Sequence, residues 1–218
     1  MVYRRTRYME ERISDRRARI FSAARAIVSE EGWAATTVSN VASRADIATG
    51  TVYRYWASKT DLCVEVVAEI SAHEIGILDQ IAISDERPGA KLATVVRTFL
   101  RRSLRGRRLA YALIAEPCDP EVEKVRLYYR AELADCIARV LRQGVDSSDF
   151  QVPDVAVAAS CIVGAFMEAL VGPLLPIRDM NPDEENALIE KITGFCMRAA
   201  LSPTTGVGED VTQTKAAG

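Results

Sequence analysis

The sequence pattern of residues 36–56 predicts a pair of short helices separated by a tight turn. Apolar side chains recur at helical spacing in TTVSNVASRA, and Thr36 or Thr37 can cap the start of that helix. The letters DIA interrupt the pattern, and TGTVYRYW resumes it as a second short helix. This arrangement is typical of a helix-turn-helix.

The second short helix carries side chains suited to nucleic acid. Val52 and Trp56 lie four residues apart and can pack inward. The remaining residues face outward or sideways: Thr49, Gly50, Thr51, Tyr53, Arg54 and Tyr55. Small residues let the helix approach the floor of the major groove, and tyrosine hydroxyls can donate to phosphate oxygens. Lys59 lies in the first turn of the next helix, where the helix dipole disfavours a positive charge. This position is explained if Lys59 faces a phosphate.

Helical patterns also dominate the rest of the chain, and no segment alternates as a strand does. Ser14 or Asp15 can cap the first helix, and Ser58 with Asp61 three residues on resembles a capping box. Gly106 breaks a later helix. The helices expected besides the two short ones cover residues 14–32, 58–81, 88–104, 107–115, 120–144, 153–171 and 183–201. We predict an all-α fold.

The charge is divided unevenly along the chain. Residues 1–60 carry a net charge of +5 and residues 61–218 a net charge of −7. Such asymmetry indicates an N-terminal unit that meets polyanions, attached to a body that does not. We therefore expect four parts: a basic arm over 1–12, a helix-turn-helix domain over 13–60, a helical body over 61–201 and a disordered tail over 202–218.

The segment TTVSNVASRADIATGTVYRYWASKTDL resembles the DNA-binding signature of the TetR family of bacterial transcriptional regulators, and RRARIFSAARAIVSEEGWAATTV resembles the family's first helix. The likeness covers residues 16–67; the remainder is similar only in its run of long helices. Three features depart from the family pattern. The usual turn glycine is replaced by Asp46, a residue that tolerates left-handed backbone geometry but adds a negative charge near DNA. Trp56 replaces a smaller aromatic residue, and the N-terminal arm is longer and more basic.

The resemblance implies a role for each matching residue. Thr37 and Ser39 would meet phosphates and a base edge from the first short helix. The base-reading turn and the contacts around it would be formed by Thr49, Gly50, Thr51, Tyr53, Arg54, Tyr55 and Lys59. We also expect Arg4, Arg5 and Arg7 of the arm to lie against the DNA backbone or in a minor groove. The implied partners are double-stranded operator DNA, a small-molecule effector and a second copy of the chain.

The dimer has independent support in the sequence. VAVAASCIVGAFMEALVG is apolar nearly all round its helix, and Ser160 and Gly164 allow another helix to approach closely. Pairing with the last helix would give a two-fold four-helix interface. The expected interface residues are Ala158, Ser160, Cys161, Gly164, Ile189, Ile192, Phe195 and Cys196. The alternative is an internal core helix. The uncharged run of 13 residues, 155–167, is shorter than the roughly 20 that span a membrane, so we expect no membrane partner.

A ligand pocket in the body is expected from the resemblance, and its candidate lining is drawn from aromatic, apolar and arginine side chains. The candidates are Phe99, Arg101, Arg105, Tyr111, Ile114, Tyr128, Tyr129, Phe166 and Met167. RTFLRRSLRGRR holds six arginines in 12 residues. These arginines either form a solvated face paired with Asp119, Glu121 and Glu123, or hold an acidic effector such as an acyl-coenzyme A or fatty acid.

Catalytic chemistry finds little support. His73 is the only histidine, which rules out a histidine-based metal cluster or triad within one chain. Five cysteines without a Cys-x-x-Cys pair indicate reduced thiols of a cytosolic protein. We expect no enzyme activity, no cofactor and no metal. The function expected is a repressor released from a palindromic operator by its effector. Two alternatives remain open: an activator or co-repressed regulator of the same fold, and a helical ligand-binding protein without DNA binding.

Overall fold

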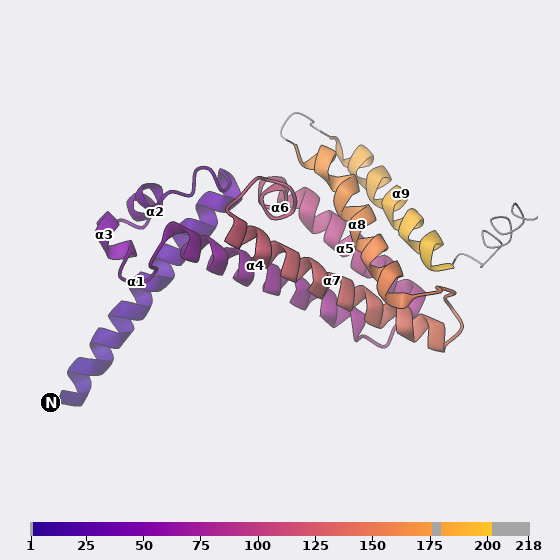
Figure 1. Ribbon diagram of the computed structural model, residues 1–218, viewed down its shortest axis with the longest axis horizontal. Helices are drawn as coiled ribbons and strands as arrows, with labels where there is room; N and C mark the ends of the chain where they lie inside the picture. The colour runs from indigo at the N-terminus through magenta and orange to yellow at the C-terminus, as the bar shows by residue number, and fades with distance from the viewer. Residues whose placement is uncertain (1, 176–179, 202–218) are drawn as a thin grey trace, which may run out of the picture.

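The described residues, 2–175 and 180–201 of the computed structural model, form helices and no strand. Of residues 2–13 the backbone alone is described. Within these two ranges nine helices follow one another (Figure 1): α1 (Val2–Glu30), α2 (Val38–Arg44), α3 (Thr49–Val52), α4 (Lys59–Ala82), α5 (Pro88–Arg105), α6 (Arg107–Ile114), α7 (Pro120–Asp146), α8 (Val155–Leu174) and α9 (Pro182–Leu201). The all-α fold is confirmed. The expected disordered tail lies outside the described residues.

The first helix begins earlier than expected. Ser14 and Asp15 were the predicted caps, but α1 runs without a break from Val2, so both residues lie inside it. The physical reason is that YRRTRYMEER contains good helix formers and neither glycine nor proline, so nothing stops the helix. The residues expected to form a basic arm, including Arg4, Arg5 and Arg7, therefore continue α1, which projects beyond the head (Figure 1).

The head is built around an apolar core that α1, α2, α3 and the first half of α4 share. Val52 and Trp56 are buried in it, as the sequence predicted. The third helix is shorter than expected, because α3 ends at Val52. Residues 53–55 form a turn, which is closed by a hydrogen bond of 3.2 Å from the amide of Trp56 to the carbonyl of Val52. The chain has to turn here because α4 begins only three residues later.

The long helix α4 takes part in two apolar cores. Its predicted N-cap is confirmed, since Ser58 Oγ accepts a hydrogen bond of 3.1 Å from the amide of Asp61. Leu62, Val66 and Ile70 belong to the core of the head. Leu78, in the second half of the helix, belongs to the core of the body. A side chain on α4 can therefore contact either part of the molecule.

The body packs α5, α7, α8 and α9 beside the second half of α4, with α6 bridging to the head (Figure 1). The predicted break at Gly106 separates α5 from α6. The predicted end of α7 at Gly144 is two residues short, since the helix ends at Asp146. Gly144 itself is required by packing, because an added Cβ would lie 2.0 Å from the ring of Phe150.

Candidate DNA-binding face and internal cavity

The turn between α2 and α3 depends on a left-handed residue. Asp46 has φ of 52°, a left-handed conformation that aspartate tolerates better than most residues. The amide of Ile47 then donates to the carbonyl of Ala42 at 3.0 Å. Arg19 of α1 stabilises the same turn, because its guanidinium donates a hydrogen bond of 2.5 Å to the carbonyl of Ala45.

Apart from the three arginines in the first turns of α1, the residues predicted to contact DNA lie between the N-cap of α2 and the first turn of α4, at the side of the head away from α8 and α9 (Figure 1). Tyr53 is 55% exposed. The other exposed members are Thr37, Ser39, Thr49, Gly50 and Arg54, while Thr51, Tyr55 and Lys59 are half-buried. Thr37 has a second role, because its Oγ1 accepts from the amide of Asn40 at 3.1 Å and caps α2.

Gly50 is unusual among the glycines of the head. A Cβ added there would meet no atom within 4 Å, and its φ is an ordinary one, so neither packing nor backbone geometry in this chain demands glycine. Gly32, by contrast, has φ of 88° and would place a Cβ 1.5 Å from Arg108 Nη2. A glycine that the chain itself does not need leaves the start of α3 open to close approach by a partner.

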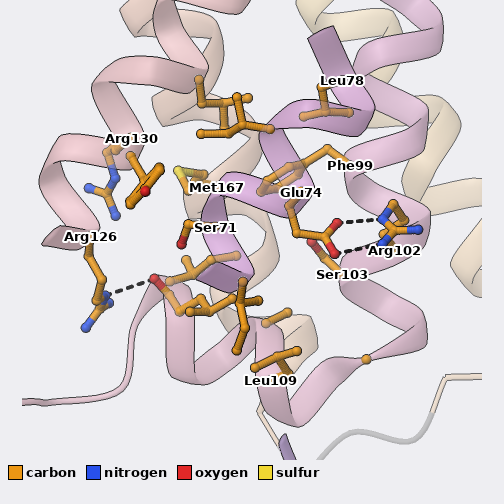
Figure 2. A pocket seen from close by; sticks show the side chains of 18 of the residues that line it. Ser71, Glu74, Leu78, Phe99, Arg102, Ser103, Leu109, Arg126, Arg130 and Met167 are labelled. Carbon is orange, nitrogen blue, oxygen red and sulfur yellow. Dashed lines mark hydrogen bonds and ion pairs between the residues drawn. The ribbon is translucent and has the colours of Figure 1, made fainter. Parts of the chain in front are cut away.

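A cavity of about 410 Å³, partly open to solvent, lies between α4, α5, α6, α7 and α8 (Figure 2). Five predicted residues line it: Phe99, Arg105, Ile114, Tyr129 and Met167. The contribution of α4 was missed by sequence reasoning and comprises Ile70, Ser71, Glu74, Ile75 and Leu78. No signal in the sequence separates these side chains from core residues, because both recur at helical spacing.

Four predicted lining residues lie elsewhere. Phe166 is buried behind Phe99, with ring centroids 4.8 Å apart, and supports the wall instead of facing the cavity. Tyr128 is exposed on the outer side of α7. Tyr111 packs under the guanidinium of Arg108 at 5.8 Å, and Arg101 points to solvent. For these four residues, helical spacing predicted the helix correctly, but it did not predict the direction in which each side chain points.

The cavity is apolar inside and basic on one side. Glu74 and Arg102 form a two-pronged ion pair in its wall, with oxygen–nitrogen distances of 2.5 and 2.7 Å (Figure 2). Arg126 and Arg130 of α7 lie on the opposite side. A second hollow of about 640 Å³ adjoins this side and shares Arg126, Arg130 and two apolar residues with the first. An occupant with an apolar part and a negatively charged group would match this division.

The arginine-rich stretch is paired differently from the expectation. Asp119, Glu121 and Glu123 were the expected partners. The observed pairs are Arg97 with Glu190, Arg102 with Glu74, Arg107 with Glu185 and Arg108 with Glu116. Arg97 and Arg102 lie on α5, which packs beside α9 and α4, so carboxylates of those two helices are within reach. Arg105 lines the cavity.

Helix α8 presents an apolar face to the outside. By length and composition it could cross a membrane, a test that core helices also pass, and only 28% of its most apolar stretch is buried. Val157 is 59% exposed, and Phe195 of α9 is 55% exposed. The predicted interface residues Ser160, Cys161, Gly164 and Phe195 are all exposed, and Ala158 is half-buried.

Three residues expected at the dimer interface lie inside the chain instead. Ile189, Ile192 and Cys196 belong to the core of the body, where α9 packs on α5 and α8. The pattern of α9 showed an apolar face, but it held no information on whether that face meets its own chain or a second copy. Among residues 2–175 and 180–201, no three histidine, cysteine, aspartate or glutamate side chains gather so as to hold a metal ion.

A three-helix head with an exposed recognition segment (residues 49–56), joined by one shared helix to a body with a partly open cavity, defines a class: DNA-binding transcriptional regulators. Residues 20–66 match the profile of the "bacterial regulatory proteins, tetR family", and residues 87–192 match a "tetracyclin repressor-like, C-terminal domain". The chain belongs to the TetR family.

Individual relatives agree with this assignment. The transcriptional repressor KstR of Mycobacterium tuberculosis is 34% identical over 62% of this chain and 62% of its own length. KstR of Mycolicibacterium smegmatis is 34% identical over 45% of this chain, and the match spans 48% of that protein. FadR of Bacillus subtilis, solved in complex with stearoyl-CoA, is 20% identical over 84% of this chain and 98% of that one, with a TM-score of 0.72.

Proposed function

We propose that the protein is a repressor that binds operator DNA as a homodimer and releases it when a small acidic, partly apolar molecule occupies the cavity. The observation that carries the proposal is the course of α4. The helix begins beside the recognition segment at Lys59 and forms one wall of the cavity from Ile70 to Leu78. Occupation of the cavity therefore acts on an element that also positions the DNA-binding face.

The DNA-binding face fits the major groove. Thr49, Gly50 and Thr51 form the start of α3, where small side chains let the helix approach base edges and a threonine methyl can meet a thymine methyl. Exposed Tyr53 and the neighbouring Lys59 are suited to phosphate oxygens. Contacts to phosphates would fix the register, and contacts from α3 would read the sequence.

The dimer would form through the exposed apolar face of α8 and α9. Val157, Cys161 and Gly164 on α8 and Phe195 on α9 offer apolar surface and close approach. A two-fold axis through this face would place two heads on one side of DNA, in successive major grooves about 34 Å apart. The operator would then be close to palindromic, and the protein would act in the bacterial cytosol.

The effector would combine an apolar part with an acidic group, because the apolar cavity adjoins Arg126 and Arg130. Stearoyl-CoA in the Bacillus subtilis FadR structure is a molecule of this general kind in a protein of the same fold. By linkage, such a ligand weakens operator binding by the same factor by which the operator weakens ligand binding.

The test is binding of the purified protein to DNA from upstream of its own gene across a salt series. We expect saturable, sequence-selective binding whose log–log salt slope changes by about 0.9 for each phosphate neutralised. Tyr53→Ala should weaken it about tenfold or more, since it removes a hydrogen bond to a charged group. Tyr128→Ala, which alters an equally exposed tyrosine of the body, is the matched control. Weak, sequence-indifferent binding that Tyr53→Ala leaves unchanged would contradict the proposal.

A further inference from the structure

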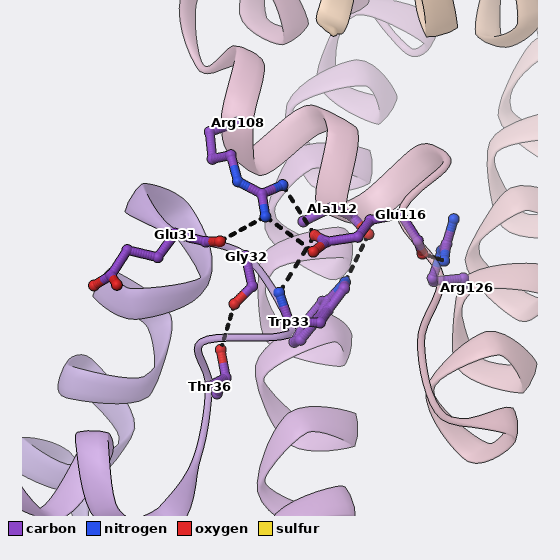
Figure 3. Close-up of polar contacts among 8 residues, drawn as sticks. All are labelled: Glu31, Gly32, Trp33, Thr36, Arg108, Ala112, Glu116 and Arg126. Atoms are coloured by element: carbon purple, nitrogen blue, oxygen red, sulfur yellow. Dashed lines mark hydrogen bonds and ion pairs between the residues drawn. The ribbon is translucent and has the colours of Figure 1, made fainter. Parts of the chain in front are cut away.

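The head and the body are joined by a compact polar junction at the start of the link between α1 and α2 (Figure 3). Arg108 of α6 donates to the carbonyl of Glu31 at 2.6 Å and pairs with both carboxylate oxygens of Glu116 at 2.9 Å. Glu116 also accepts from the amide of Trp33 at 3.3 Å. The indole nitrogen of Trp33 donates to the carbonyl of Ala112 at 2.7 Å. The junction thus binds the head at three groups, which are the carbonyl of Glu31 and the amide and indole nitrogens of Trp33.

The junction is buried and sterically demanding. Trp33 is 4% exposed, and the side chain of Glu116 is 11% exposed. Gly32 leaves the space that the Arg108 guanidinium fills, because any Cβ there would overlap it. Since charges are costly to bury unless they are paired and hydrogen-bonded, each member here depends on the others. Movement of Glu116 would therefore disturb Arg108 and Trp33 together.

Arg126 of α7 connects this junction with the cavity. Its Nε donates to the carbonyl of Leu113 at 2.9 Å, and its Nη1 donates to the carbonyl of Glu116 at 2.8 Å. Nη1 also lies 3.1 Å from Cys118 Sγ and 3.0 Å from a carboxylate oxygen of Glu123. Only 7% of the side chain is exposed, and Arg126 lines both the cavity and the adjoining hollow. The same guanidinium thus faces the ligand site and holds the backbone of Glu116.

We infer that Arg126 is the residue through which an anionic group in the cavity releases the head. The inference deepens the proposed function and rests on it for the presence of a ligand. A carboxylate or phosphate forms an ion pair with a guanidinium and can accept two parallel hydrogen bonds from it, which a single neutral carbonyl oxygen cannot. Such a group would draw Arg126 from the carbonyls of Leu113 and Glu116. The segment that carries Glu116 would then loosen, and Trp33 would lose its acceptors.

The inference also makes Arg126 a determinant of specificity. A neutral apolar molecule can fill the cavity without competing for the guanidinium, so it would bind without releasing the head. An acidic molecule of the same size would do both. The charged group, and not the filling of the cavity, is what the junction detects.

Fluorescence of Trp33 tests the inference without DNA. In a Trp56→Phe background, Trp33 is the only tryptophan, and its buried indole should emit at short wavelength. Arg126→Gln should shift the emission to the red, because the junction loosens and the indole meets water. Arg130→Gln, which removes another arginine of the same cavity one turn along α7, should leave the emission unchanged. Unchanged emission in Arg126→Gln, or equal shifts in both variants, overturns the inference.

A second variant covers a failure of Arg126→Gln to fold. Glu116→Gln removes the charge that pairs with Arg108 but keeps an oxygen for the amide of Trp33, so it perturbs the junction from its other end. It should give the same red shift with its thermal transition retained. A folded Glu116→Gln protein with the original emission also overturns the inference.

Dodecanoate and 1-dodecanol probe the charged group, since they share a chain and differ in charge. Dodecanoate should shift Trp33 emission to the red and 1-dodecanol should not, and Arg126→Gln should abolish the difference. Equal effects of the two probes, or no binding of dodecanoate, overturn the assignment. Operator binding separates the two hypotheses: we expect Arg126→Gln to weaken it about tenfold without ligand. A wild-type protein that shifts its emission but binds no operator would disprove the repressor function and leave the junction intact.

Discussion

The indole nitrogen of Trp56 donates a hydrogen bond of 2.8 Å to Glu65 Oε2, which ties the end of the recognition segment to α4. The other oxygen of Glu65 pairs with Arg17 of α1 at 2.5 Å, and the Arg17 guanidinium lies over the Trp56 ring at 5.1 Å. Three segments of the head thus meet at one carboxylate. The larger aromatic residue by which this chain departs from its family's pattern has a partner suited to it.

Glu65→Ala should destabilise the head and weaken operator binding. The substitution leaves the buried indole donor of Trp56 without its acceptor, a loss of about 1–3 kcal/mol in the free energy of unfolding. Glu69→Ala is the matched control, because Glu69 pairs with Arg25 of α1 at 3.4 Å in an exposed contact one turn along α4. An exposed pair is worth about 0–1 kcal/mol. Urea unfolding compares the two, and equal losses would contradict the role given to Trp56.

Gly50→Ala should weaken operator binding without harming the fold. The added methyl meets nothing within 4 Å in the chain, so only a partner can oppose it. Gly76→Ala is the control, because Gly76 lies within α4 and is equally unobstructed. Both changes should stabilise the helix by about 0.5–1 kcal/mol, and only Gly50→Ala should reduce affinity. Operator titration with both variants is the measurement. Equal affinity in the two would mean that α3 does not approach the DNA closely.

Lys59→Gln should change the salt dependence of operator binding. A lysine that neutralises one phosphate contributes about 0.9 to the log–log slope, so the variant dimer should lose about twice that. The loss of affinity should be similar for all operator sequences, since a phosphate contact does not read bases. Lys191→Gln on α9 removes an exposed lysine far along the chain and should leave the slope as it was. A slope that Lys59→Gln does not alter would place Lys59 away from phosphate.

Three buried thiols should make the fold sensitive to alkali. Burial raises the pKa of Cys63 to about 11, of Cys136 to about 12 and of Cys196 to about 11, from an ordinary value of 9.0. Because these folded-state pKa values are raised, the thiols' contribution to stability is complete below pH 9 and is lost as the pH rises towards 11–12. The free energy of unfolding should fall by up to about 1.4 kcal/mol per pH unit for each thiol.

Urea unfolding at a series of pH values measures this loss. Cys196→Ala should reduce the slope above pH 9, and Cys161→Ser, at an exposed position, should not. A free energy of unfolding that stays level through this range would show that the three thiols are not buried as described.

Local chemistry made much of the fold predictable. Ser58 as a cap, Gly106 as a break, Asp46 as a left-handed turn residue and Val52 as a buried anchor each depend on neighbours within a few residues. The predicted start of α1 is wrong because a serine such as Ser14 can cap a helix but does not by itself begin one. The helix continues through Ser14 without a break.

Contacts between distant segments were not predictable in the same way. Ile75 and Leu78 recur at the spacing of core residues, and only packing shows that they face a cavity. Ile189 and Ile192 pose the reverse problem, since an apolar face gives no sign of which surface covers it. Glu116 and Trp33 are separated by 83 residues, so nothing near either one in the sequence indicates their hydrogen bond.

The membership of α4 in both cores has a consequence for how the molecule comes apart. If α4 moves as a rigid helix, Leu62 and Val66 cannot leave the core of the head without displacing Leu78 from the core of the body. Head and body should therefore melt in a single transition, and a protease that opens one should degrade the other at the same rate. Proteolysis would then leave no stable fragment that binds DNA without responding to the effector.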